Sequence, residues 1–119
     1  MRSPRRTLAV MRVGEPDSDL AALPDRVRAA AHVHHNGEVV WRNDHAEDAI
    51  NALADNGKLI HGLDAWTLYP DGGVMEIPVS AWKEQAGETE DEAIERARRE
   101  ALDALPFAKS EGSHVLIGW

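Results

Sequence analysis

The histidines are the side chains of this sequence that most resemble a site for chemistry. Three of the six stand close together, as His32, His34 and His35. A metal cage would draw its nitrogen and carboxylate ligands from His32, His34, His35, Asp44, His45 and His61. Zinc needs three or four ligands that converge at about 2.0 to 2.2 Å, and neighbouring residues of a strand point to opposite faces. The chain also lacks an HExxH motif. We therefore predict no metal and no cofactor, and interpret the histidines as a polar, partly exposed cluster at a helix end or turn.

Other catalytic patterns are missing from the sequence. No serine stands in a Gly-x-Ser-x-Gly context, and Gly72-Gly73 is not followed by the Lys-Ser/Thr pair of a phosphate-binding loop. The chain has no cysteine, which excludes disulfides, thiolate catalysis and iron–sulfur clusters. These absences predict a protein that is not an enzyme. The alternative is a small metal-dependent hydrolase that uses His32, His34, His35 and Asp44.

The charge of the chain points to a protein partner. Thirteen Lys and Arg oppose 21 Asp and Glu, and the net charge is -8. Four of the arginines lie in the first twelve residues, so the remainder carries nine positive and 21 negative charges. Such a body repels phosphate backbones and attracts basic surfaces. We predict no binding to nucleic acid, and either a basic protein as partner or an acidity that serves solubility alone.

The hydropathy pattern favours a cytoplasmic protein. No stretch approaches the roughly 20 apolar residues that cross a bilayer. Residues 7–13 reach Arg12 after four apolar residues, which is too short for the core of a signal peptide. We therefore expect no membrane association.

The length of 119 residues fits one domain. Residues 1–6 read as a disordered N-terminal tail and residues 7–119 as a single α+β domain. We predict a small mixed or antiparallel sheet with two to three helices packed mainly on one face.

The first half of the chain contains two ambiguous elements and one clear helix. Residues 7–13 predict a short strand, and residues 38–41 another. A helix that begins near Leu23 either runs to His35 or ends near Ala31, in which case Asn36-Gly37 turns a hairpin. The segment Asp44-His-Ala-Glu47 has the form of a capping box and predicts a helix that Asn56-Gly57 terminates.

The second half predicts a hairpin, a helix and a last strand. Residues 58–69 form a strand bulged at Gly62, and a turn at 70–73 leads to a second strand over 75–81 with one wet face. Pro78 places this strand at a sheet edge or at a bulge. A capping box over 89–92 begins a helix that Pro106 ends. Residues 114–117 predict a buried closing strand.

Four tryptophans fall on predicted strands or strand ends. Trp41 is expected in the core. Trp66 and Trp82 straddle the predicted hairpin, where aromatic side chains beside acids make a good surface for a partner. The acids near them in the sequence are Asp64, Glu76 and Glu84.

The middle of the chain resembles a known family. The resemblance rests on Val39-Val-Trp41, the helix at 46–53, Lys58-Leu-Ile-His-Gly-Leu-Asp-Ala-Trp66, a Pro-Asp-Gly-Gly turn, Ala81-Trp82 and a Glu-rich last helix. Over about residues 38–105 this pattern is similar to the Immunity protein 40 family of bacterial polymorphic toxin systems. The family pattern has Gly-Gly-Asp where this chain has His61-Gly-Leu-Asp64, and an Asn where it has Ala81.

The resemblance implies a non-enzymatic protein that neutralises a cognate toxin domain by stoichiometric binding. Under this hypothesis the contact residues are Asp64, Trp66, Glu76 and Trp82, with Glu47 and Asp48 at the edge of the surface. A further alternative is a structural domain that associates with itself through the strand near Pro78 or the last strand to Trp119. The chain is accordingly expected to be a monomer or a homodimer.

Overall fold

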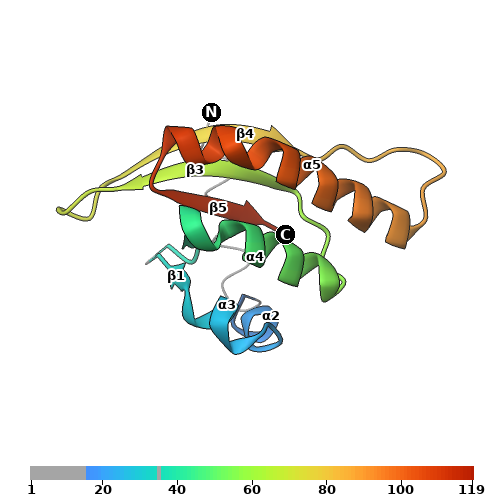
Figure 1. Cartoon of the computed structure of the whole chain (residues 1–119), viewed down its shortest axis with the longest axis horizontal. Coiled ribbons are helices and arrows are strands. Elements are labelled where there is room, and N and C mark those ends of the chain that lie inside the picture. Colours follow the sequence, from blue (N-terminus) through green and yellow to red (C-terminus); the bar gives the residue numbers. More distant parts are fainter. Residues whose placement is uncertain (1–15, 35) are drawn as a thin grey trace.

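A computed structural model describes residues 16–34 and 36–119, which form an α+β fold around one antiparallel sheet (Figure 1). The strands lie in the order β1-β2-β5-β3-β4. Their bounds are Ala31–Val33 (β1), Val39–Arg42 (β2), Gly62–Leu68 (β3), Val74–Ala81 (β4) and His114–Gly118 (β5). The helices are Pro16–Ala21 (α2), Asp25–Ala29 (α3), Asn43–Asp55 (α4) and Glu90–Glu111 (α5). The predicted fold class is confirmed, and the sheet is antiparallel rather than mixed.

The main core lies between the sheet and the two long helices, α4 and α5. Trp41 of β2 is fully buried there, and its indole Nε1 donates a hydrogen bond to the carbonyl of Val27 at 3.0 Å. Ile50 of α4, Ala101 of α5 and Val115 of β5 belong to the same cluster. The prediction that Trp41 is a core residue is therefore confirmed.

The last strand, β5, lies in the middle of the sheet. Leu116 is opposite Val40 of β2 on one side and Asp64 of β3 on the other. The prediction of a buried closing strand is confirmed. β5 pairs with β2 on one side and with β3 on the other, so it has no open edge. This contradicts the expectation that a self-associating domain would use the last strand.

The region before β2 contains two short helices and a hairpin. Pro24 precedes α3, which spans Asp25–Ala29 and so ends close to Ala31, as in the shorter of the two helices predicted from Leu23. Of the two arrangements considered, the hairpin is the one observed, since Gly37 has a positive φ of 91° and donates its N–H to the carbonyl of His34 at 2.8 Å. The strand predicted at 7–13 and the tail at 1–6 lie outside the described residues.

The start of α4 differs from the prediction. Asn43 is already helical and Arg42 is the N-cap, with no side-chain cap hydrogen bond, so the capping box predicted from Asp44 to Glu47 is wrong. The helix follows β2 directly because the Asn43 N–H donates to the carbonyl of Ser113 at 3.2 Å. The predicted end is confirmed at Asn56 and Gly57, where Gly57 has a φ of 79°.

The β3–β4 hairpin is confirmed with changes in detail. β3 begins at Gly62 rather than at residue 58, and the register shift lies between Leu63 and Asp64, not at Gly62 itself. β4 is an edge strand of the sheet, and Pro78 pairs with Asp64 at the register shift, as the missing N–H of proline requires. The face predicted to be buried is only partly covered, because Met75 is exposed.

The helix α5 begins as predicted but ends later. The Thr89 hydroxyl accepts the N–H of Glu92 at 3.1 Å, and the Glu92 carboxylate accepts the N–H of Thr89 at 2.9 Å. The prediction that Pro106 ends this helix is wrong, since it continues to Glu111 with Pro106 on its exposed side. Packing of Leu105 and Ala108 in the core holds the turns on either side of the proline.

Between α5 and β5, the chain passes close to the backbone of β3 at Gly112. A Cβ atom at Gly112 would lie 2.5 Å from the carbonyl oxygen of Trp66. The Ser113 N–H donates to that same oxygen at 2.9 Å. The amide of Asn43 donates to the carbonyls of Lys109 at 3.0 Å and Gly112 at 2.7 Å, which ties the end of α5 to the start of α4.

We expect Gly112→Ala to destabilise the fold by about 1 to 3 kcal/mol, because the new methyl group would have to displace the backbone of β3. Urea unfolding followed by tryptophan fluorescence measures the change. Asp103→Ala, at an exposed site of α5, is the control and should change the free energy of unfolding by less than about 0.5 kcal/mol. An unchanged midpoint for Gly112→Ala would contradict this account.

Candidate functional site

Two of the predicted contact residues are buried. Trp66 is 1% exposed and Asp64 is 5% exposed. Both lie on β3, which has β5 on one side and β4 on the other. The prediction that Asp64 and Trp66 lie on the surface is therefore wrong, because strands flank β3 on both sides and neighbouring side chains cover the face on which Trp66 lies.

Trp66 instead organises a cluster on the sheet face opposite α4 and α5. Its indole packs with Val40 and Leu116, and the ring of His34 meets it edge-on with 5.3 Å between ring centroids. The indole Nε1 donates to a carboxylate oxygen of Glu76 at 2.7 Å, across the β3–β4 pair. Glu76 is half-buried, so this predicted contact residue has a structural hydrogen bond in addition to any role in binding.

Trp82 lies just after β4, beside the first half of α5. The Arg96 guanidinium carbon stands 5.1 Å from the centroid of the Trp82 ring, which is a cation–π distance. Arg96 also donates to the carboxylate of Glu88 at 2.6 and 2.8 Å and to Glu100 at 2.9 Å. The hydrogen bond from Arg96 lowers the pKa of Glu88 below its ordinary value. Trp82 is thus half-buried in an ion-pair network, and not an open aromatic surface.

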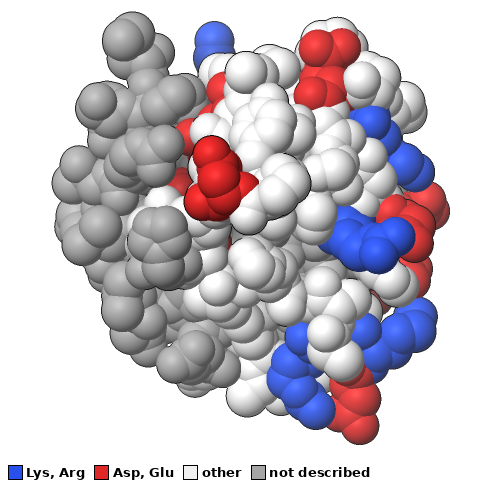
Figure 2. Space-filling model, turned by 90° about the vertical axis from the view of Figure 1, so that its left-hand side faces the viewer, with Lys and Arg blue, Asp and Glu red and all other residues white. Residues whose placement is uncertain are grey.

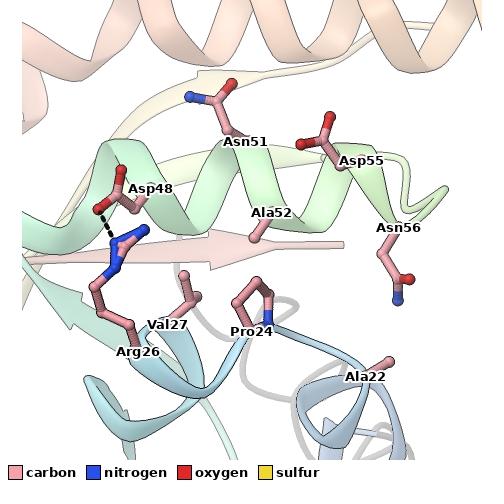
Figure 3. Close-up of a pocket in the computed structure, with 9 residues that line it drawn as sticks. All are labelled: Ala22, Pro24, Arg26, Val27, Asp48, Asn51, Ala52, Asp55 and Asn56. Carbon is pink, nitrogen blue, oxygen red and sulfur yellow. Dashed lines mark hydrogen bonds and ion pairs between the residues drawn. The ribbon is translucent and has the colours of Figure 1, made fainter.

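The two predicted edge residues, Glu47 and Asp48, are exposed on α4. Asp48 accepts a hydrogen bond from Arg26 of α3 at 3.2 Å, an ion pair between two open side chains. Figure 3 shows this pair at one end of a cavity of about 290 Å³ between α3 and α4. The polar groups that line the cavity are Arg26, Asp48, Asn51, Asp55 and Asn56.

A second hollow lies between α4 and the C-terminal half of α5. This groove has a volume of about 360 Å³ and is lined by Glu47, Leu102, Leu105, Pro106 and Lys109. Its floor is apolar, and it has one acid from α4 and one base from α5. We name it the α4–α5 groove. Sequence reasoning found Glu47 but missed Leu102 and Pro106, the latter because it was assigned to a helix end.

The six predicted contact residues therefore do not form one surface. Glu47 and Asp48 lie on α4, Trp82 lies beside the start of α5, and Asp64 and Trp66 are inside the molecule. The α4–α5 groove is at the opposite end of α5 from Trp82, as the positions of Arg96 and Pro106 along the helix show.

The histidines considered as metal ligands are dispersed. His32 and His34 are 6.3 Å apart between ring centroids, His45 lies 3.9 Å from Asp44, and His61 faces Trp82. His35 lies outside the described residues. Within the part of the chain that the structure describes, no three His, Asp or Glu side chains are placed to hold one metal ion.

His114, which sequence analysis did not single out as a ligand, has an imidazole whose pKa is lowered by its surroundings. Burial lowers its pKa, and the neighbouring His32 and Arg42 lower it further. Its Nδ1 lies 2.8 Å from the hydroxyl of Ser113. This histidine belongs to the same sheet face as Trp66, its partner in the β3–β5 register.

No family model, no curated protein and no solved structure matches this chain. In residues 16–34 and 36–119, none of the helices is both long and apolar enough to cross a bilayer.

We expect Trp66→Ala to lower the free energy of unfolding by about 3 to 5 kcal/mol, because it empties a fully buried site and removes the hydrogen bond to Glu76. Chemical denaturation followed by circular dichroism measures this loss. Tyr69→Ala, an exposed aromatic truncation on the same hairpin, is the control and should cost less than about 1 kcal/mol. Equal, small losses for both variants would show that Trp66 is not a core residue.

The lowered pKa of His114 predicts a loss of stability in acid. Above about pH 6.5 the imidazole is neutral in both the folded and the unfolded chain, so it has no effect. Below that pH the unfolded chain binds a proton that the folded protein resists, and stability falls until the folded pKa is reached. Between pH 7.5 and pH 5.5, we expect the melting temperature of His114→Gln to fall by less than that of the parent. His45→Gln, in the first turn of α4, is the control, and an equal loss in all three proteins would contradict the assignment.

Proposed function

We propose that this chain is a non-enzymatic immunity protein, which neutralises a cognate toxin domain by binding it in a one-to-one complex. The proposal rests on the resemblance of residues 38–105 to immunity proteins, on the acidic charge and on the α4–α5 groove. The groove is the observation that carries it, because it combines an apolar centre with a charged border. This is the usual composition of a protein interface, in which an apolar core is surrounded by polar residues.

The exposed acids of α4 and α5 favour a basic partner. On α4 the exposed acids are Asp44, Glu47, Asp48 and Asp55. On α5 they are Glu90, Asp91, Glu92, Glu95, Glu100, Asp103 and Glu111. Opposite charges on two proteins speed their encounter and fix their relative orientation, more than they raise affinity. A toxin domain that attacks nucleic acid would have a basic surface around its active site, and the acidic helix layer would cover it.

The mode of inhibition proposed here needs no chemistry from this chain. Affinity would come from burying Leu102 and Pro106 against the toxin, since a few well-buried apolar contacts dominate most interfaces. Glu47 would pair with a cation of the partner at the border of the groove. Asp48 is less available for such a pair because Arg26 already binds it.

The test is a binding assay with the toxin domain encoded next to this gene. We expect a one-to-one complex in size-exclusion chromatography with light scattering. The double substitution Glu47→Lys with Leu102→Ala should weaken the complex about 10-fold to 100-fold, because it reverses a border charge and shortens an apolar contact.

The matched control is Glu84→Lys, which makes the same change of charge at an exposed site between β4 and α5, outside both helices. It should change the affinity by less than about 3-fold. Because Leu102 also packs against the core, circular dichroism has to show that the groove variant is still folded at the assay temperature. If the parent chain neither binds the toxin domain nor protects cells that express it, the proposed function is wrong. If the parent binds and the groove variant binds equally well, another surface is used.

A further inference from the structure

The hairpin of β3 and β4 extends beyond the helix that covers it. Gly112 lies against the backbone of Trp66, so α5 ends at the level where Trp66 pairs with Glu76. The pairs Thr67–Met75 and Leu68–Val74 continue past that level. Figure 1 shows the hairpin projecting at this end of the molecule, beside the end of α5.

The helix side of the projecting hairpin has exposed apolar side chains. Ala65 pairs with Val115 of the main core, so residues two and four positions further along β3 share its face. That rule places Thr67 and Tyr69 on the helix side, with Met75 opposite Thr67. Tyr69 is 44% exposed and Met75 is 52% exposed. No α5 residue covers them, because the helix has already ended.

Phe107 adds a third apolar side chain from α5, and it is 56% exposed. Arg96 and Glu100 face β4, as their contacts with Trp82 and Ser80 show. Phe107 follows Glu100 by seven residues, close to two helical turns, and therefore lies on the same side of the helix. It is two turns nearer to the projecting hairpin. We name Tyr69, Met75 and Phe107 the hairpin patch.

The hairpin patch adjoins the α4–α5 groove. Pro106 lines the groove, and the next residue, Phe107, lies about 100° further around the axis of α5, toward the side of the helix that faces β4. Figure 2 looks at this end of the molecule. Among the residues drawn in white, red or blue, the middle of the view is largely uncharged, with acidic side chains at the top and left of the middle and both acidic and basic side chains along the right and lower edges. Among the described residues, three of the four large apolar side chains that are exposed belong to this patch. Tyr, Met and Phe are the types enriched at the centre of protein interfaces.

The acidic side chains next to the patch favour a basic partner. Glu100, Asp103 and Glu111 lie along α5, and Asp71 lies in the hairpin turn. From these positions and the three exposed side chains, we infer that the hairpin patch docks a basic segment of the toxin domain that has an apolar side chain at its centre. This inference rests on the proposed function and extends its surface from the groove across the end of α5.

A second copy of this chain fits the patch less well. Two copies that meet at their hairpin patches would bring the acids of one next to the same acids of the other. Like charges at an interface cost free energy, whereas a basic partner gains from the same arrangement. The charge of the patch therefore favours a different protein over a homodimer.

The experiment compares two exposed apolar truncations in the same binding assay. The double substitution Met75→Ala with Phe107→Ala should weaken the complex with the purified toxin domain by at least about 10-fold. The control is Val33→Ala, which truncates the fourth exposed apolar side chain, 49% exposed on β1 at the other edge of the sheet. It should change the affinity by less than about 2-fold. Asp71→Lys should reduce the dependence of the association rate on salt.

The outcomes separate this inference from the proposed function. A complex that forms with the parent but is unaffected by Met75→Ala with Phe107→Ala overturns the patch and leaves the function standing. Failure of the parent to bind the toxin domain removes both. If light scattering shows a parent dimer that the double substitution converts to a monomer, the occupant is a second copy and the inference is wrong. Met75, Phe107 and Val33 are all exposed, so the two truncation variants should keep the melting temperature of the parent. A loss of binding can then not be due to unfolding.

Discussion

The contact between Gly112 and the backbone of Trp66 is the constraint on which the arrangement of this molecule depends. A side chain at residue 112 would meet the Trp66 carbonyl at 2.5 Å, so the chain can pass there only as glycine. The Ser113 N–H then takes that carbonyl and starts β5, which fills the gap between β2 and β3. α5 ends directly before this contact, so it does not extend over the rest of the β3–β4 hairpin. The place of β5 in the middle of the sheet and the uncovered end of the β3–β4 hairpin both depend on the glycine at residue 112.

The sequence predicted those elements whose ends are decided by neighbouring residues. Thr89 and Glu92 cap each other across one helical turn, and Gly57 has the positive φ that ends a helix. The ends of α4 and α5 that were mispredicted depend on distant contacts. Asn43 begins α4 through a bond to residue 113, and α5 passes Pro106 because both neighbouring turns are packed in the core. A proline costs about 3 kcal/mol inside a helix, which packing of this extent can offset.

The surface was harder to predict than the fold, because exposure depends on the order of the strands. Alternation along β3 correctly separates the face of Ala65 from that of Trp66. It does not reveal that β3 lies inside the sheet, where Trp66 is buried on its own face. Met75 shows the reverse case, since it lies on the face expected to be buried and stays exposed where no helix reaches it. Neither result could be derived without knowing that the last strand occupies the middle of the sheet.

The ion pairs within the chain determine which charges a partner meets. Six of the cations in the described part are bound to acids of the same chain, namely Arg26, Arg28, Arg42, Lys58, Arg96 and Arg98. Because such pairs cancel locally, the field outside the helix layer comes mainly from the acids in excess. A basic partner would therefore gain attraction along α4 and α5 without first displacing the internal network. In the proposed complex, the α4–α5 groove and the hairpin patch would then supply the apolar contacts that hold the two proteins together.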